Sequence, residues 1–254
     1  MQNLVEMVSS YSKVAENKMH KGSINLFFSG VLSGFFIAIG GYASQVLNYK
    51  LNNAALGSLV FPLGLFLVVT LQTELFTGNC LLFIKLFQSK SIKEFFQSLS
   101  RIIRNFIIVY ISNSFGAHIF AIIIYKIELD PNMQSLIISA AAAKVNKSPE
   151  VLFYSAIMCN IIVCLAVFLA SNVSSIVEKF CAVYMAIYIF VLCGFEHCVA
   201  NMYTVFIGWL LFSENNALNY WYNLFYVTLG NLFGGVLISL LLVLTTKTYK
   251  FIKK

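Results

Sequence analysis

The chain alternates long apolar stretches with short polar gaps. The three prolines are widely spaced, and no gap is long enough to be an interdomain linker. A membrane-crossing helix needs about 20 apolar residues. Runs long enough to cross a bilayer cover residues 25–47, 55–87, 101–127, 150–171, 178–212 and 219–246. We therefore predict an all-α membrane protein with six transmembrane helices, forming one transmembrane channel domain over residues 1–254.

The second and fifth apolar runs are too long for a single crossing, and each contains a polar motif near its middle. The motifs read QTELFTGN at residues 72–79 and GFEHCVAN at residues 194–201. Irregular backbone at membrane depth is tolerated only where protein or a water-filled cavity surrounds it. The pattern predicts that helices 2 and 5 are broken and that the breaks border a solute pathway.

The two halves of the chain share these features in the same order. In both halves a glutamate lies five positions before an asparagine: Glu74 before Asn79, and Glu196 before Asn201. The span that follows carries NSFG at 113–116 in the first half and NLFG at 231–234 in the second. Three spans per repeat would make the halves run in opposite directions. We predict two inverted three-helix repeats, an arrangement typical of transporters with a site near the bilayer midplane.

Composition and charge support the membrane assignment. Hydrophobic residues make up 59% of the chain, charged residues 11%, and the mean hydropathy is +0.83, whereas soluble domains carry about 25% charged residues. The net charge of +7 could suggest a nucleic-acid partner, but the basic residues cluster in alternate polar segments. The positive-inside rule then places both termini and a loop from Lys85 to Arg104 in the cytoplasm, and we expect no nucleic-acid partner.

The ends of the chain are polar. Residues 1–21 lack the apolar core of a signal peptide and have helical amphipathic spacing, which predicts a cytoplasmic N-terminal amphipathic segment. Residues 247–254 are predicted to form a cytoplasmic basic tail.

Few ionisable residues lie inside the apolar runs, where each is energetically expensive. Glu74 and Glu196 could accept hydrogen bonds from backbone N–H groups freed at the breaks, with Asn79 and Asn201 as further support. Direct contact with the solute is the alternative for both carboxylates. No nucleophile or metal-binding cluster accompanies them, so neither an enzyme nor a cofactor or metal is expected.

His197 has no counterpart in the first half, where Leu75 takes its place. A lone histidine is commonly a core residue, but this one lies at a predicted break beside a glutamate. It could bind an anion as a cation or hand it a proton. Thr77 lies opposite in the repeat scheme, and the two predict a polar waist at the midplane. Lys144, in a predicted outer loop, could raise the local anion concentration or simply be solvated.

Apolar rings are expected on both sides of this waist. The candidates, which could equally be packing residues, lie on or next to the broken helices: Phe61, Leu65, Leu75, Phe76 and Phe190.

Four motifs resemble those of the formate/nitrite transporter family. They are TELFTGN at 73–79, CNIIV at 159–163, GFEHCVAN at 194–201 and GNLFGG at 230–235, and the likeness covers essentially the whole chain. The resemblance implies an aquaporin-like homopentamer in the cell inner membrane, with one pore per protomer. It also implies passage of small monovalent anions or their conjugate acids, such as formate, nitrite, hydrosulfide, acetate or lactate.

The resemblance also implies roles for individual residues. His197 would be the central histidine with Thr77 as its partner, and Lys144 would be the vestibule lysine. Glu196 and Asn201 would hold the break. The pathway would then be completed by Leu75, Phe76 and Phe190 as constrictions, with Phe61, Leu65, Asn160 and Val163 alongside.

Two mechanisms and one other class of protein stay open at this point. Protonation at or near His197 and Thr77 would let the solute cross as a neutral acid, whereas a cationic His197 would serve an anion channel. The alternative class is an aquaporin-like channel for neutral small solutes, which the absence of an Asn-Pro-Ala signature argues against.

Overall fold

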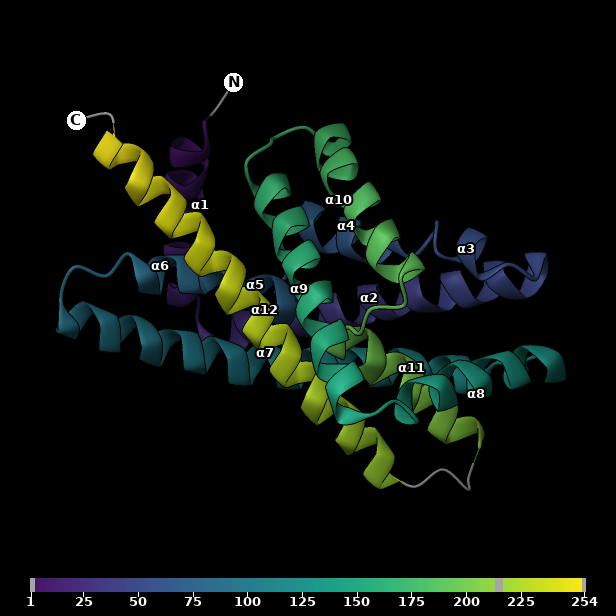
Figure 1. The fold of residues 1–254 in the computed structure, drawn as a ribbon. Helices are drawn as coiled ribbons and strands as arrows, with labels where there is room; N and C mark the ends of the chain where they lie inside the picture. Colours follow the sequence, from purple (N-terminus) through teal and green to yellow (C-terminus); the bar gives the residue numbers. More distant parts are fainter. Residues whose placement is uncertain (1–2, 213–216, 253–254) are drawn as a thin grey trace.

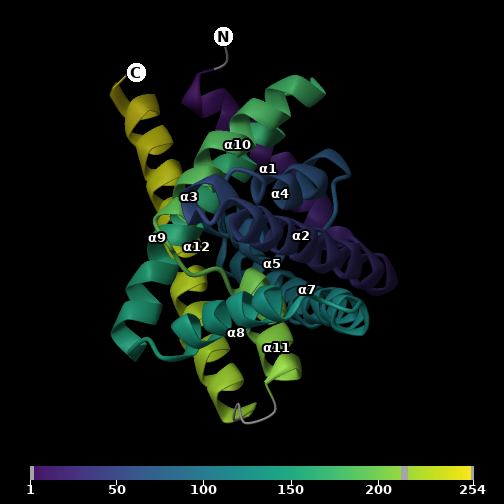
Figure 2. The same cartoon turned by 90° about the vertical axis from the view of Figure 1, so that its right-hand side faces the viewer.

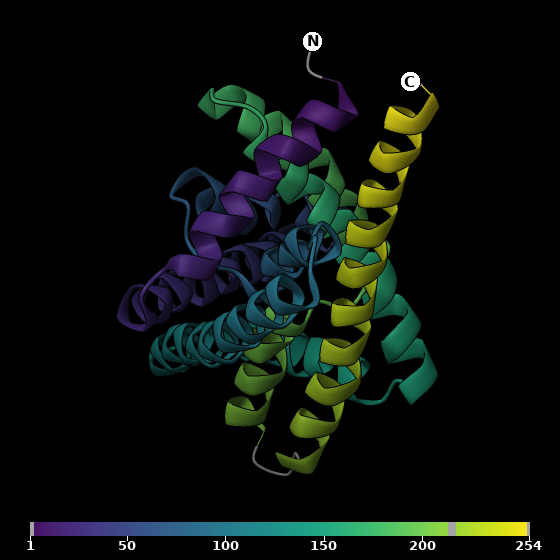
Figure 3. The same ribbon diagram turned by 90° about the vertical axis from the view of Figure 1, so that its left-hand side faces the viewer.

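The computed structural model describes residues 3–212 and 217–252, and all regular elements in these ranges are helices. α12 crosses the whole molecule, whereas α1 and α8 lie at opposite ends of it (Figures 1 and 2). α1 lies at the same end as the C-terminal part of α12 (Figure 3). In chain order the elements are α1 (Leu4–His20), α2 (Ser23–Leu51), α3 (Ala54–Gly57), α4 (Pro62–Thr70), α5 (Phe76–Asn79), the 3-10 turn η1 (Cys80–Leu82), α6 (Phe83–Phe87), α7 (Ile92–Lys126), α8 (Pro131–Val145), α9 (Pro149–Ser171), α10 (Ile176–Leu192), α11 (Cys198–Leu211) and α12 (Ala217–Ile252).

Among the described residues, four helices are long and apolar enough to cross a membrane: α2, α7, α9 and the Asn219–Lys247 part of α12. They pack as two close pairs, α2 with α7 and α9 with α12. A Cβ on Gly34 or Gly116 would collide with the backbone of the other helix in the first pair, and one on Gly230 or Gly234 would do so in the second. Small residues allow this close approach of membrane helices.

The two remaining apolar segments are interrupted at their polar motifs, as predicted. Segment 55–87 contains α4, then an irregular stretch at 71–75, then the short elements α5, η1 and α6. Segment 178–212 contains α10 and α11, separated by residues 193–197. Neither segment is one continuous helix, so both leave backbone groups that need partners.

Both interruptions begin with the same type of helix ending. Thr73 N–H donates to Val68 O (3.0 Å) after α4, and Phe195 N–H donates to Phe190 O (3.1 Å) after α10. This six-residue closure is the Schellman motif, in which one residue adopts the left-handed conformation. That residue is Gly194, with φ of 66°, in the second half, but Gln72, with φ of 54°, in the first. Glycine adopts this conformation without steric cost, whereas a glutamine is strained there.

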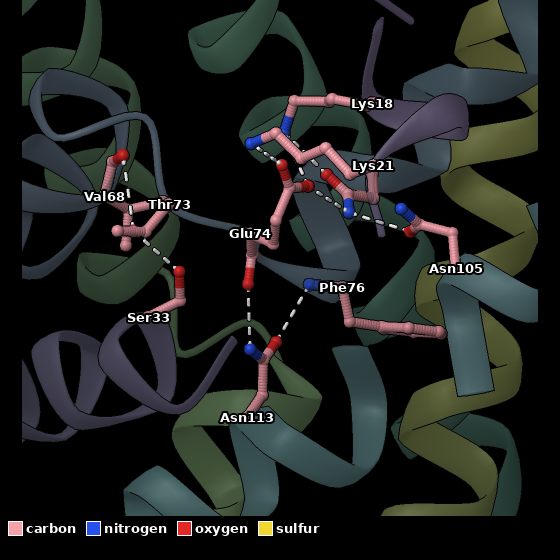
Figure 4. Close-up of polar contacts among 10 residues, drawn as sticks. Lys18, Lys21, Ser33, Val68, Thr73, Glu74, Phe76, Asn105 and Asn113 are labelled. Atoms are coloured by element: carbon pink, nitrogen blue, oxygen red, sulfur yellow. Dashed lines mark hydrogen bonds and ion pairs between the residues drawn. The ribbon is translucent and has the colours of Figure 1, made fainter. Parts of the chain in front are cut away.

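One asparagine of α7 holds the first interruption in place. The Asn113 Nδ2 group donates to Gly30 O (2.8 Å) on α2 and to Glu74 O (2.9 Å) within the break. Its Oδ1 accepts the N–H of Phe76 (2.9 Å), the first residue of α5. The side chain therefore pairs a backbone carbonyl within the break and the first backbone N–H after it (Figure 4).

Asn231 of α12 does the same for the second interruption. Its Nδ2 donates to Ala156 O (2.8 Å) on α9 and to Glu196 O (2.9 Å), and its Oδ1 accepts the N–H of Cys198 (2.8 Å). The shared Asn-x-Phe-Gly signature in the sequence thus marks the side chain that stabilises each break.

Three sequence predictions need correction. The predicted loop from Lys85 to Arg104 is largely helical, because Ser91 caps α7 by accepting the Glu94 N–H (3.2 Å) and the helix continues outward past its apolar part. Lys144 lies in the last turn of α8 rather than in a loop, since the alanine run that precedes it favours helix. Residues 247–252 extend α12 and do not form a separate tail; residues 253–254 lie outside the described ranges.

α1 is amphipathic, as predicted, and the protein itself covers its apolar face. Its buried side chains contact α6, η1, α7, α9 and α12. Arg104 of α7 donates to the last carbonyls of the helix, at Met19 O (3.0 Å) and Lys21 O (2.7 Å). Lys85 pairs with Glu16 (2.9 Å), and this hydrogen bond lowers the pKa of the Glu16 carboxyl. These contacts fix the position of the C-terminal end of α1.

Replacing Asn231 by alanine tests the role of this side chain at the break. Asn231→Ala removes three hydrogen bonds and leaves the Glu196 carbonyl and the Cys198 N–H at the break unpaired. Each such group costs about 1–3 kcal/mol, so we expect a loss of at least about 2 kcal/mol in unfolding free energy. The measurement is the thermal midpoint of the detergent-solubilised protein. Asn219→Ala, at an exposed position of the same helix, is the control, and equal midpoints for the two variants would contradict the assignment.

Candidate functional site

A buried carboxylate lies in the first interruption and is held by two lysines. Glu74 is fully buried, and its Oε1 and Oε2 atoms accept from Lys21 Nζ (2.6 Å) and Lys18 Nζ (3.0 Å) of the α1 end (Figure 4). Asn79 Nδ2 donates to Glu74 Oε2 (2.8 Å) and to Asn105 Oδ1 (2.9 Å) of α7. Two ammonium groups and one carboxylate give this cluster a net charge of +1.

The second interruption has a cluster of the same composition. Glu196, also fully buried, accepts from Lys147 Nζ (2.6 Å) and Lys144 Nζ (3.0 Å), which lie at and just after the end of α8. Asn201 Nδ2 donates to Glu196 Oε2 (2.7 Å) and to Asn223 Oδ1 (2.8 Å) of α12. This cluster also carries a net charge of +1.

The histidine and threonine predicted to meet do so. Thr77 Oγ1 of α5 and His197 Nε2 lie 2.9 Å apart, and both side chains are buried. His197 Nδ1 accepts the N–H of Ala200 (3.1 Å), which makes His197 the cap of α11. Because a backbone N–H can only donate, this pattern assigns the ring as the neutral tautomer with its proton on Nε2. That proton is donated to Thr77, whose own hydroxyl hydrogen is left for another acceptor.

Aromatic rings approach this pair from one side. Phe190 of α10 stacks on His197 with a centroid separation of 5.9 Å, and Phe61 meets Phe190 edge to face at 5.6 Å. All three side chains are buried. The structure therefore groups Phe61 of the second apolar run with Phe190 and His197 of the fifth.

The other predicted pathway residues lie elsewhere around the breaks. Phe76 packs against Phe106 (5.3 Å) and Tyr110 (5.0 Å) of α7. Asn160 Nδ2 donates to Asn231 O (2.6 Å), while its Oδ1 has no partner within the described ranges. The remaining three are buried on or beside the broken helices and α9: Leu65, Leu75 and Val163. Their roles stay predictions.

A cavity of about 480 Å³, here called the α1-side vestibule, opens beside the first break. Leu75 and Gly78 lie on its wall, so it reaches the break itself. Its polar and charged lining comes from α1, the break, and the segment from the end of α9 into α10: Asn17, Lys18, Lys21, Gln72, Thr73, Asn79, Ser171, Ser174 and Lys179.

Sequence reasoning did not predict that lysines pair with the two glutamates, and it gave Lys144 only as an anion-attracting or solvated residue. Lys18 and Lys21 were interpreted only as part of a basic N-terminal segment, and Lys147 and the two asparagines Asn105 and Asn223 were not singled out. The sequence did contain one signal: the two lysines lie three positions apart in each half, at Lys18 and Lys21 and at Lys144 and Lys147. On a helix this spacing places both ammonium groups on one face.

The site has no arrangement suited to metal chemistry. Within the described parts of the chain, no group of three or more His, Cys, Asp or Glu side chains could hold a metal ion. The chemistry that these residues offer is hydrogen bonding, charge attraction and exclusion of water.

Comparison with known proteins gives concordant matches along nearly the whole chain. A probable formate transporter of Methanothermobacter thermautotrophicus is 32% identical over 89% of this chain and 90% of its own length. The formate channel FocA of Haemophilus influenzae is 28% identical over 92% of this chain and 90% of its own. These relatives are transport proteins rather than enzymes.

The fold matches solved channel structures as well. A pentameric formate channel with formate bound superposes with a TM-score of 0.73 at 27% identity, covering 91% of this chain and 97% of that one. The family described as Formate/nitrite transporter matches residues 5–245. With its apolar helices, this integral membrane protein therefore belongs to the formate/nitrite transporter family.

Proposed function

We propose that this chain conducts small monovalent anions of the formate, nitrite and hydrosulfide type, or their conjugate acids, through a pathway within each protomer. This proposal rests on the contact between Thr77 and His197, which lies where the two interrupted segments meet. Rings of Phe61 and Phe190 adjoin this pair, and a cluster with net positive charge lies at each break.

We further propose six spans arranged as two inverted repeats, with an aquaporin-like fold. In this arrangement the four uninterrupted helices and the two interrupted segments each cross once. The matched networks support the repeat: each half supplies two lysines, a buried glutamate and three asparagines in the same hydrogen-bonding order. α1 and α8, which donate the lysines, lie at opposite ends of the molecule (Figure 1).

The protein would reside in the cell inner membrane as a homopentamer with cytoplasmic termini. The clustering of lysines and arginines in alternate segments supports this orientation. The solved relative that is described as a pentamer supports the assembly. Exposed apolar side chains along α2 and α7 offer surface for lipid or neighbouring protomers.

The central physical problem is the cost of moving an anion past apolar rings. Transfer of a bare carboxylate-sized ion into an apolar medium costs on the order of 20 kcal/mol before relaxation. The net positive clusters would concentrate the anion at each mouth. A proton taken up at or near Thr77 and His197 would then let the solute cross as a neutral acid, which avoids most of that cost.

The hydrogen bonds of His197 favour this acid route over conduction past a permanently cationic ring. Protonation of Nδ1 would break the contact with the Ala200 N–H and so remove the cap of α11. In the neutral form His197 donates to Thr77, and the Thr77 hydroxyl is free to donate to the solute. The two residues would thus act as an ordered donor chain at the waist.

The alternative, an aquaporin-like channel for neutral solutes, has less support. The net positive charge of the clusters at both breaks would not attract a neutral solute, and the relatives named above are described as formate transporters and channels.

Loss of the Thr77 hydroxyl tests the donor chain. Thr77→Val keeps the shape of the side chain but leaves His197 Nε2–H without its acceptor. We expect formate flux in proteoliposomes to fall about tenfold or more, equivalent to 1.4 kcal/mol or more. His197→Ala should lose flux as well. Thr245→Val, which removes an exposed hydroxyl bonded to its own helix, is the control and should retain flux. Unchanged flux in folded Thr77→Val and His197→Ala proteins, for every anion tested, would overturn the assignment of the pair.

The pH dependence of flux separates the two mechanisms. At fixed total formate and a pH above the pKa of formic acid, each unit decrease in pH raises the neutral acid about tenfold. Under the acid route, the initial rate should rise in proportion and be electroneutral. A pH-independent, electrogenic current would instead establish conduction of the anion.

The orientation is tested with green fluorescent protein fused after Lys254. A cytoplasmic C-terminus gives a fluorescent fusion in intact cells, and we expect this outcome. A dark but fully expressed fusion would place the C-terminus on the opposite side.

A further inference from the structure

The α1-side vestibule contains a third lysine beyond the two that hold Glu74. Lys179 of α10 lines the cavity together with Lys18 and Lys21. No Asp or Glu is among the described residues that line it. Because Lys18 and Lys21 are already bonded to Glu74, their charge is partly neutralised.

Lys179 lacks such compensation. Its ammonium group makes no ion pair or hydrogen bond within the described ranges of the chain, and the side chain is half-buried. It also lies in the first turn of α10, just after Ser175 caps the helix. The positive end of the helix dipole disfavours a cation at this position. A partly buried ammonium group without a protein partner in a water-accessible cavity is available to bind an anion.

Gln72 lines the same cavity from the first break. It occupies the left-handed position of the Schellman motif, where the other half of the molecule has Gly194. Its side-chain amide makes no hydrogen bond to any other part of the described chain. The strain at Gln72 is therefore not offset by a side-chain hydrogen bond within the described chain, and a glycine would relieve it.

Lys179 of α10 and Gln72 of the first break belong to different elements but line the same cavity. We propose that Lys179 and Gln72 form an anion-capture site in the α1-side vestibule, with Lys179 supplying charge and the Gln72 amide supplying hydrogen-bond donors. The ligand is a small monovalent anion of carboxylate type, held before it reaches Leu75. The site rests on the proposed function and determines how readily the solute enters from the α1 side.

The test measures formate uptake from each face separately, using inside-out and right-side-out membrane vesicles. Lys179→Gln should raise the KM for the α1-side face about threefold, the change expected when one unit charge is removed from a hydrated site. The KM of the opposite face and the maximal rate should not change. The wild-type KM of the α1-side face should also depend more strongly on ionic strength than that of the variant.

Two substitutions of Gln72 separate the amide from the strain. Gln72→Gly and Gln72→Ala both remove the amide, and both should raise the KM of the α1-side face. Only glycine adopts the left-handed conformation without strain, so only Gln72→Gly should also gain thermal stability. Stabilisation by Gln72→Gly with unchanged KM would show that the amide has no role in capture.

Lys90→Gln is the matched charge control. Lys90 lies between α6 and α7 and outside the vestibule lining. An unchanged KM in both Lys179→Gln and Gln72→Gly, or an equal rise in Lys90→Gln, would overturn the capture site. A wild-type protein that carries no small anion from either face would overturn the proposed function, and the capture site with it.

Discussion

Two buried glutamates determine how this structure is held together. Each lies where an apolar segment is interrupted, and each pairs with two lysines from the C-terminal end of a separate helix, α1 or α8. A buried carboxylate without such partners would be prohibitively costly. The same contact therefore stabilises the break, fixes α1 or the end of α8 against it, and leaves one excess positive charge near each end of the proposed pathway.

The proposed function depends on residues at which the two matched halves differ. The networks of glutamate, lysine and asparagine are shared, and they account for the architecture. His197 corresponds to Leu75, and Thr77 corresponds to Val199, so the contact between His197 and Thr77 joins two positions at which the halves differ in sequence. Gln72 and Gly194 differ in the same way at the start of each break, and this difference gives the α1-side vestibule its own chemistry.

The state of His197 links the helix break to the proposed transport mechanism. Its ring caps α11 through one nitrogen and donates to Thr77 through the other. A side chain that uses both nitrogens in this way is held neutral and rigid, with Phe190 stacked against its face. The positive charges lie at the two glutamate clusters rather than on the ring, which suits attraction of an anion followed by passage of its acid.

The sequence by itself determined the helical class, the four uninterrupted spans, the two interruptions and the family. These are local properties, because the length of an apolar run and a polar motif within it are read from neighbouring residues. It also predicted the meeting of Thr77 and His197, through the likeness of the two halves. Only the tertiary structure identified the lysines that neutralise Glu74, which lie more than fifty positions away in the chain, and the strain at Gln72. A lysine in a basic segment has the same local pattern whether it faces water or a buried carboxylate, and only the packing of α1 against the break distinguishes the two.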